Sequence, residues 1–204
     1  MARGLALASA LNSPLAQLPA TFPPSPLGRL LENPPTPLIC GLDTIQQDME
    51  RLPQGIRRLA VQLRLNLDPL FLWDVLTDYE NLSRFIPNLT SSSLLWRQGN
   101  RVGLEQVGTQ QFCGMRFSAR VKLELTELKD QGRLSFRMLE GDFRCFEGVW
   151  CIGNDASSSW LLYELTVQGK PGMPLGLIEQ RLQQDLASNL RGVQREALRR
   201  AATS

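Results

Sequence analysis

The stretch LWDVLTDYENLSRFIPNL, residues 72–89, constrains the fold more than any other part of this sequence. Its aromatic and aliphatic residues are interrupted halfway by polar ones. The Asp68-Pro69 pair just before it suits a helix N-cap followed by proline in the first turn. The pattern Thr77-x-x-Glu80 has the spacing of a capping box, which predicts that a second helix begins where the first one ends. Pro87 ends that second helix. Two short apolar helices are therefore expected to follow each other directly.

Strand patterns lie on both sides of this stretch. Before it, residues 58–68 alternate between apolar and polar side chains, which is typical of a half-buried antiparallel strand. After it, the clearest pattern is CGMRFSARVKLELTE, residues 113–127, in which apolar residues occupy the odd positions. Short turn sequences that contain glycine separate the other candidates. The strands predicted after the helices are 92–97, 101–110, 113–127, 132–139, 142–152 and 158–167.

The sequence ends in an amphipathic helix pattern. From Pro174 to Arg200, apolar residues recur at steps of three and four, which predicts a helix of about 25 residues that begins at Pro174. Glu196 and Arg200 have the i,i+4 spacing of an ion pair. The complete order is one strand, two short helices, six or so strands and one long helix. It predicts an α+β fold, with a curved antiparallel sheet of about seven strands wrapped on the C-terminal helix.

Residues 1–50 differ in composition from the rest of the chain. Eight of the thirteen prolines lie in the first 37 positions, and no acidic residue precedes Glu32. Because dense proline breaks helices and strands, we expect this segment to be largely disordered. A targeting peptide is the alternative interpretation, with a plastid as the destination if the host is a phototroph. Residues 42–52 are expected to form a short helix that leads into a domain spanning residues 55–200.

The composition excludes several kinds of chemistry. The 204 residues include no histidine, which removes Ser-His-Asp and Cys-His catalysis. The four cysteines form no CxxC pair and the carboxylates do not cluster, so we predict no metal site and no cofactor. We expect the cysteines to be reduced and buried. Since no uncharged apolar run reaches about 18 residues, we expect a soluble, cytoplasmic protein, with a peripheral membrane contact as the further option.

The element order and several motifs resemble the START-like helix-grip superfamily, also called SRPBCC. Within it, the sequence is most similar to the polyketide cyclase/dehydrase and coenzyme Q-binding branch. The resemblance runs from about residue 57 to 200 and implies a tunnel between the sheet and the long helix. Family members use that tunnel for lipids, isoprenoid quinones, polyketides or hormones, and the two short helices close one of its ends. The matching segments are FLWDVLTDYENLSRFIPNL, GLEQVG, FSARVKLEL, FRMLEGDFRCFEGVW, LLYELTV and PLGLIEQRLQQDLASNLRGVQREA.

The resemblance implies that a ligand contacts the inward-facing side chains of this tunnel. Aromatic and methionine side chains there would form an adaptable apolar surface, and ordinary core packing is the alternative for each of them. Either Glu105 or Gln106 should point inward, whereas we expect a bulge at Gly148 to turn Glu147 to solvent. The predicted lining residues are Phe85, Ile86, Glu105, Gln106, Phe112, Met115, Phe117, Phe136, Met138, Phe143, Trp150, Tyr163, Ile178 and Leu182.

These features favour a protein that binds or chaperones a hydrophobic small molecule, an isoprenoid quinone or a lipid, and no catalytic residue is assigned. A cyclase or dehydratase acting on a polyketide-like substrate is the first alternative, with Tyr163 and either Glu105 or Gln106 as its polar groups. The second alternative is an interaction module that contacts a ribosome or a membrane through the arginine-rich final helix. A net charge of only +2 disfavours sequence-specific nucleic-acid binding.

Overall fold

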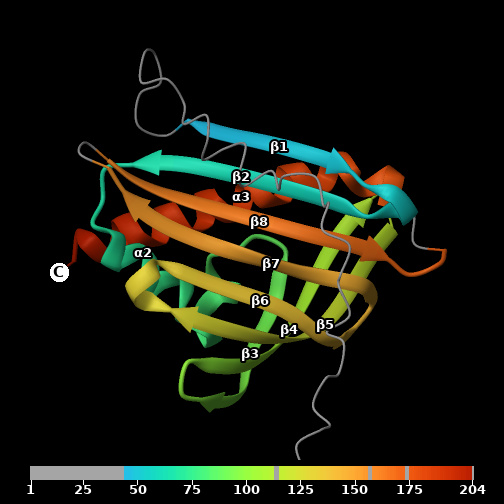
Figure 1. Cartoon of the computed structure of the whole chain (residues 1–204), viewed down its shortest axis with the longest axis horizontal. Coiled ribbons are helices and arrows are strands. Elements are labelled where there is room, and N and C mark those ends of the chain that lie inside the picture. The colour runs from blue at the N-terminus through green and yellow to red at the C-terminus, as the bar shows by residue number, and fades with distance from the viewer. Residues whose placement is uncertain (1–43, 113–114, 156–157, 173–174, 204) are drawn as a thin grey trace, which may run out of the picture.

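A single curved antiparallel sheet forms one layer of the fold, and a long helix lies against its concave face (Figure 1). The computed structural model describes residues 44–112, 115–155, 158–172 and 175–203. The strands are β1 (Ile45–Arg51), β2 (Arg57–Leu65), β3 (Leu89–Gln98), β4 (Arg101–Phe112), β5 (Met115–Leu128), β6 (Arg133–Gly141), β7 (Phe143–Asn154) and β8 (Ser159–Gly169). The helices are α2 (Pro69–Leu76) and α3 (Leu175–Ala201), with 3-10 helices η1 (Pro53–Gly55), η2 (Tyr79–Arg84) and η3 (Lys129–Gln131).

The order of strands across the sheet is β1-β2-β8-β7-β6-β5-β4-β3, and all neighbours are antiparallel. Strand β2, which precedes the short helices, therefore lies beside β8, which precedes α3. This arrangement confirms the predicted helix-grip α+β fold. The sheet has eight strands, however, and not about seven.

The eighth strand comes from a segment that we predicted to be helical. Residues 42–52 are expected to form a short helix, but Ile45–Arg51 form β1 and pair with β2. Ile45 and Met49 are four residues apart, so they share one face in a helix and in a strand alike. The backbone groups at the edge of β2 decide the outcome, because pairing with β1 satisfies them. The sheet thus includes residues before the expected domain boundary at 55, and the predictions for residues 1–43 lie outside the described residues.

Helix α2 begins as the sequence predicts, but the second short helix differs. The Asp68 carboxylate accepts a hydrogen bond from the Leu70 N–H at 2.8 Å, which confirms the N-cap. The capping box is not formed, because Thr77 Oγ1 donates to the carbonyl of Trp73 at 2.9 Å. Thr77 is still the C-cap residue of α2, so its hydroxyl bonds backwards to the preceding turn. The next segment is the 3-10 helix η2 in place of an α-helix.

The main hydrophobic core lies between the concave face of the sheet and the helices. The inward residues of β2 are almost completely buried, as predicted, but Ala60 and Gln62 on its other face are buried too, so the strand is not half-buried. Helix α3 comes close enough to the segment after η2 that a Cβ at Gly192 would lie 2.3 Å from the Phe85 carbonyl oxygen. Glycine at this position therefore permits the contact. The core residues of β2 and α3 are Leu59, Val61, Leu63, Leu65, Leu186, Leu190, Val193 and Ala197.

The C-terminal end of α3 is fixed by ion pairs. Arg200 Nε lies 2.8 Å from Glu196 Oε1, as the i,i+4 spacing predicts, and Arg199 bonds the same carboxylate. These bonds, that from Arg199 above all, lower the pKa of Glu196 to about 2. Arg200 Nη2 also lies 2.6 Å from Asp78 Oδ2, which ties α3 to the segment between the two short helices. The predicted helix start at Pro174 lies outside the described residues.

Ion pairs also cover the convex face of β4, β5 and β6. Glu124 lies between Arg101 and Arg137, and Arg137 Nη2 is 2.8 Å from Glu124 Oε1. The hydrogen bonds from Arg101 and then Arg137 lower the pKa of Glu124 below its usual value. Lys122 Nζ lies 2.7 Å from the Glu140 carboxylate on the neighbouring strand. This face is therefore held by charge pairing, unlike the concave face.

Two further predictions concern the membrane and the cysteines. Among the described residues, no helix is both long enough and apolar enough to cross a bilayer. Cys145 and Cys151 are free, half-buried thiols, and burial raises the pKa of both. Cys40 and Cys113 lie outside the described residues.

Candidate ligand-binding cavity

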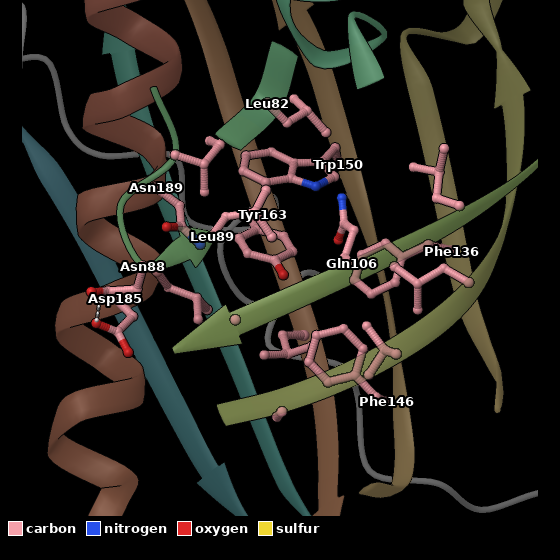
Figure 2. A pocket seen from close by; sticks show the side chains of 18 of the residues that line it. Leu82, Asn88, Leu89, Gln106, Phe136, Phe146, Trp150, Tyr163, Asp185 and Asn189 are labelled. Atoms are coloured by element: carbon pink, nitrogen blue, oxygen red, sulfur yellow. Dashed lines mark hydrogen bonds between the residues drawn. The ribbon is translucent and has the colours of Figure 1, made fainter. Parts of the chain in front are cut away.

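A cavity of about 370 Å³ lies between the concave face of the sheet and α3 (Figure 2). Strands β3 to β8 line it from one side and α3 from the other, while α2 and η2 contribute to one end. This volume lies near the lower end of the range of roughly 300–1,000 Å³ that is typical of pockets for small ligands.

Aliphatic side chains form most of the wall. Leu76 from the last turn of α2 and Leu82 from η2 close the end that the two short helices cover. Helix α3 contributes Leu182 and Leu186 from the opposite side. The aliphatic residues from the sheet are Leu89, Leu104, Val121, Leu123, Leu125, Leu134 and Leu165.

A row of aromatic rings from β6, β7 and β8 forms the rest of the apolar wall. The rings of Trp150 and Tyr163 stack in parallel, with centroids 4.0 Å apart and planes inclined by 3°. Phe136 contacts Tyr163 with centroids 6.0 Å apart and Phe146 with centroids 5.8 Å apart. Phe143 stacks on Phe146 at 5.2 Å. The cavity thus has one continuous aromatic side, in which the Phe136 ring is tilted against its neighbours.

The position of Phe146 depends on an irregularity in β7. The pairing of β7 with β8 shifts between Phe143 and Cys145, so that Phe143, Phe146 and Trp150 all face the cavity. Glu147 is exposed, as we predicted. The predicted cause was wrong, because the irregularity lies three residues or more before Gly148, which itself remains in register with β6 and β8.

Three polar side chains of the wall, each from a different element, have a donor or acceptor without a partner among the described residues (Figure 2). Tyr163 on β8 is 6% exposed, and its hydroxyl makes no hydrogen bond within the described residues. Burial raises the pKa of this phenol. Gln106 on β4 donates through Nε2 to Ser92 Oγ at 3.2 Å, which leaves its carbonyl oxygen available. Asn189 on α3 has a buried Oδ1 without a partner.

Asn88, Asp185 and Tyr79 also line the cavity, but they bond other protein groups. Asn88 Nδ2 donates to Asp185 Oδ1 at 3.1 Å, as the dashed line in Figure 2 marks. Tyr79 Oη donates to Glu127 Oε1 at 2.6 Å, and Arg97 lies 3.0 Å from the same carboxylate. Burial first, and then the bond to Glu127, raise the pKa of Tyr79. Tyr79 and Tyr163 both line the cavity, but only Tyr163 has an unused hydroxyl.

This arrangement offers little for acid–base chemistry. Among the described lining residues, the only carboxylate is Asp185, and no arginine or lysine is present. The raised pKa of Tyr163 keeps its phenol protonated at neutral pH, so it is a hydrogen-bond donor and not a base. In the part of the chain that the structure describes, no group of histidine, cysteine or acidic side chains is arranged to hold a metal ion.

The predicted lining residues fall into three groups. Ile86, Gln106, Phe136, Phe143, Trp150, Tyr163 and Leu182 line the cavity. Phe85, Glu105 and Met138 do not: Phe85 and Met138 are partly buried against the core, and Glu105 pairs with Arg120 on the convex face. The side chains of Phe112, Met115, Phe117 and Ile178 lie outside the described residues.

Sequence patterns missed several lining residues. Phe146 is absent from the predicted lining, because its orientation depends on the shift in the pairing of β7 with β8. Asn189 could have been predicted as a lining residue, since it lies seven residues after Leu182 and thus on the same face of the helix. Asn88 and Asp185 lie next to each other only because α3 packs against the segment after η2.

Comparison with known proteins places this geometry in a family. Residues 65–191 match the family model described as polyketide cyclase / dehydrase and lipid transport. A search of curated proteins gives no match.

Solved structures with the same fold include three bacterial proteins. The protein TTHA0849 from Thermus thermophilus has a TM-score of 0.62 and 22% identity, over 72% of this chain and 99% of that one. The ZhuI aromatase/cyclase from a Streptomyces species has a TM-score of 0.62 and 15% identity, over 72% and 96%. A STAR-related lipid transfer protein from Xanthomonas axonopodis has a TM-score of 0.59 and 15% identity, over 74% and 98%. At these identities the likeness concerns the fold alone. Since the family model covers more than half of the sequence, the chain belongs to the polyketide cyclase / dehydrase and lipid transport family.

Proposed function

We propose that this protein binds a hydrophobic small molecule in the cavity and holds it without changing it chemically. Family members bind hydrophobic ligands or act as polyketide cyclases. The observation that favours binding is the lining itself, which is apolar on nearly all sides and includes no acid–base pair among its described residues. An isoprenoid quinone or a lipid with a single chain has the apolar character that this wall accommodates.

The size of the cavity limits the ligand. A volume of about 370 Å³ suits one ring system or one short isoprenoid chain, whereas a lipid with two acyl chains needs more space. The aromatic side, built around the parallel Trp150 and Tyr163 rings, would stack on a flat ligand ring. The leucines at the α2 and η2 end would surround a flexible chain.

The first experiment is native mass spectrometry of protein purified from its own host, followed by solvent extraction and identification of what is bound. We expect a stoichiometric apolar adduct. Protein that is empty after purification from a cell rich in lipids and quinones would argue against the proposal.

Two variants connect the adduct with the cavity. Phe136→Asp places a charge in the aromatic wall and should abolish retention, while Leu139→Asp, which alters an exposed residue of the same strand, should retain the adduct. Because Phe136→Asp also endangers folding, Ala119→Phe provides a second test. It adds a ring to the cavity from β5 and should expel the ligand while the circular dichroism spectrum stays native.

A cyclase or dehydratase remains the alternative function, and the unused hydroxyl of Tyr163 beside Gln106 is the observation that favours it. Glu105, the other polar group considered for this role, points away from the cavity and pairs with Arg120. Conversion of a polyketide-like substrate by the purified protein, lost in Tyr163→Phe, would replace the binding proposal with this one.

A further inference from the structure

Tyr163, Asn189 and Gln106 in the cavity wall have complementary hydrogen-bonding needs. The Tyr163 hydroxyl has a proton to donate and no partner within the described residues. The Asn189 carbonyl oxygen is buried without a donor, and the Gln106 carbonyl oxygen remains available after Nε2 has bonded Ser92. A polar group that stays buried and unpaired is unfavourable, so a ligand that satisfies these groups gains affinity.

These groups come from β8, β4 and α3 and face one cavity (Figure 2). A ligand hydroxyl satisfies both kinds of group at once, because it accepts a hydrogen bond from Tyr163 and donates its own proton to an amide oxygen. A carbonyl-only ligand, such as a quinone, can pair with Tyr163 but supplies no donor for Asn189 or Gln106. The polar set therefore distinguishes alcohols and phenols from ketones.

The charges around the cavity also favour an uncharged ligand. No described lining residue is cationic, and Asp185 contributes a carboxylate to the wall. A phosphate or fatty-acid carboxylate in the cavity would thus lack the arginine or lysine partner that buried anions require.

We propose that the ligand is a neutral hydroxyl-bearing amphiphile, an isoprenoid alcohol or a phenol such as a quinol, whose hydroxyl pairs with Tyr163 and with the amide oxygen of Asn189 or Gln106. This inference rests on the proposed binding function and names the chemical class within it. The apolar part of the ligand then lies against the aromatic row and the leucines, where it needs no polar partner.

Four probes of equal chain length test this class: farnesol, farnesal, farnesene and farnesoate. Their affinities can be measured from the change in tryptophan fluorescence, since Trp150 lines the cavity. We expect the lowest Kd for farnesol and the highest for farnesoate. Each hydrogen bond contributes about 0.5–1.5 kcal/mol, which corresponds to a change in Kd of about 2- to 10-fold between farnesol, farnesal and farnesene.

Variants show whether the named residues cause this order. Tyr163→Phe, and separately one of the two variants Asn189→Leu and Gln106→Leu, should raise the Kd of farnesol by about 2- to 10-fold and leave that of farnesene almost unchanged. The matched control is Tyr79→Phe, because this second lining tyrosine already bonds Glu127. It should preserve the order of the four probes.

The possible failures are distinguishable. Equal affinity for farnesene and farnesol, or tightest binding of farnesoate, overturns this inference but leaves the cavity as a binding site. Absence of binding by all four probes, with no effect of Ala119→Phe on any adduct, overturns the inference together with the proposed function.

Discussion

The concave and convex faces of the sheet are formed by alternate residues of the same strands, yet they are stabilised by different interactions. On β5, Leu123 and Leu125 point into the core and cavity, whereas Lys122 and Glu124 lie on the convex face in ion pairs. Burial of an aliphatic side chain contributes roughly 1.5–3 kcal/mol, while exposed ion pairs typically contribute about 0–1 kcal/mol. The concave face should therefore account for most of the stability as well as the binding, and the convex face for much less of either.

The largest expected difference in stability between changes to inward and to outward residues is on α3. Leu190 is completely buried, and Leu198 on the same helix is 45% exposed. Leu190→Ala should lower the free energy of unfolding by about 2–5 kcal/mol, because it leaves a cavity in the core. Leu198→Ala should change it by no more than about 0.5 kcal/mol. Urea denaturation measures both, and equal losses would mean that Leu198 is covered by a partner.

A smaller difference in stability is expected between alanine substitutions at two glycines in the sheet. A Cβ at Gly148 would lie 2.1 Å from the Glu164 carbonyl oxygen and 2.7 Å from the Phe136 ring, so Gly148→Ala should cost about 1–3 kcal/mol. A Cβ at Gly103 would instead meet the indole of Trp96, which is 36% exposed. Since this side chain can rotate away, Gly103→Ala should cost less and should shift the tryptophan emission. The opposite order of the two urea midpoints would contradict this comparison.

Removing an ion pair of the convex face should have the smallest effect on the free energy of unfolding, and this effect should depend on pH. Because the arginines lower the pKa of folded Glu124, its carboxylate stabilises the fold above the usual glutamate pKa. That contribution is lost as the pH falls through the lowered pKa. The wild-type protein should thus exceed Glu124→Gln in stability at neutral pH, and the difference should shrink in acid.

The matched control for this series is Glu147→Gln, which removes an exposed glutamate of β7 that forms no ion pair within the described residues. Its free energy of unfolding at neutral pH should stay close to that of the wild-type protein, because no ion pair of the described residues is broken. A difference between wild type and Glu124→Gln that stays constant from neutral to acidic pH would show that packing, and not charge, is responsible.

Much of the fold could be predicted from the sequence because its signals are local. The Asp68 cap, the alternation of β2 and the i,i+4 pair of Glu196 with Arg200 each depend on residues close together in the chain. Local patterns gave a wrong prediction where contact with a distant segment of the chain determines the secondary structure. The β1 segment has periodicity compatible with helix and strand, and the edge of β2 selected the strand.

In the candidate site, too, local patterns predicted some residues and contacts between distant segments determined others. Tyr163 could be named in advance, because alternation along a strand indicates which residues share a face. The same rule could not indicate Phe146, since a shift in the pairing of β7 reverses the face of the residues beyond it. Glu105 and Gln106 are adjacent, so they lie on opposite faces of β4. Because both are polar, the sequence alone left open which of them faces the cavity.

By itself, the sequence determined the class of the fold, the order of its elements and the apolar character of the face that α3 covers. Only the tertiary structure decided that a space of about 370 Å³ remains there and that Asn189, Gln106 and Tyr163 meet around it. The physical reason is that the periodicity of apolar residues specifies which face of an element is buried. The volume left between two buried faces, and the polar atoms left unpaired in it, depend on how elements distant in sequence pack together.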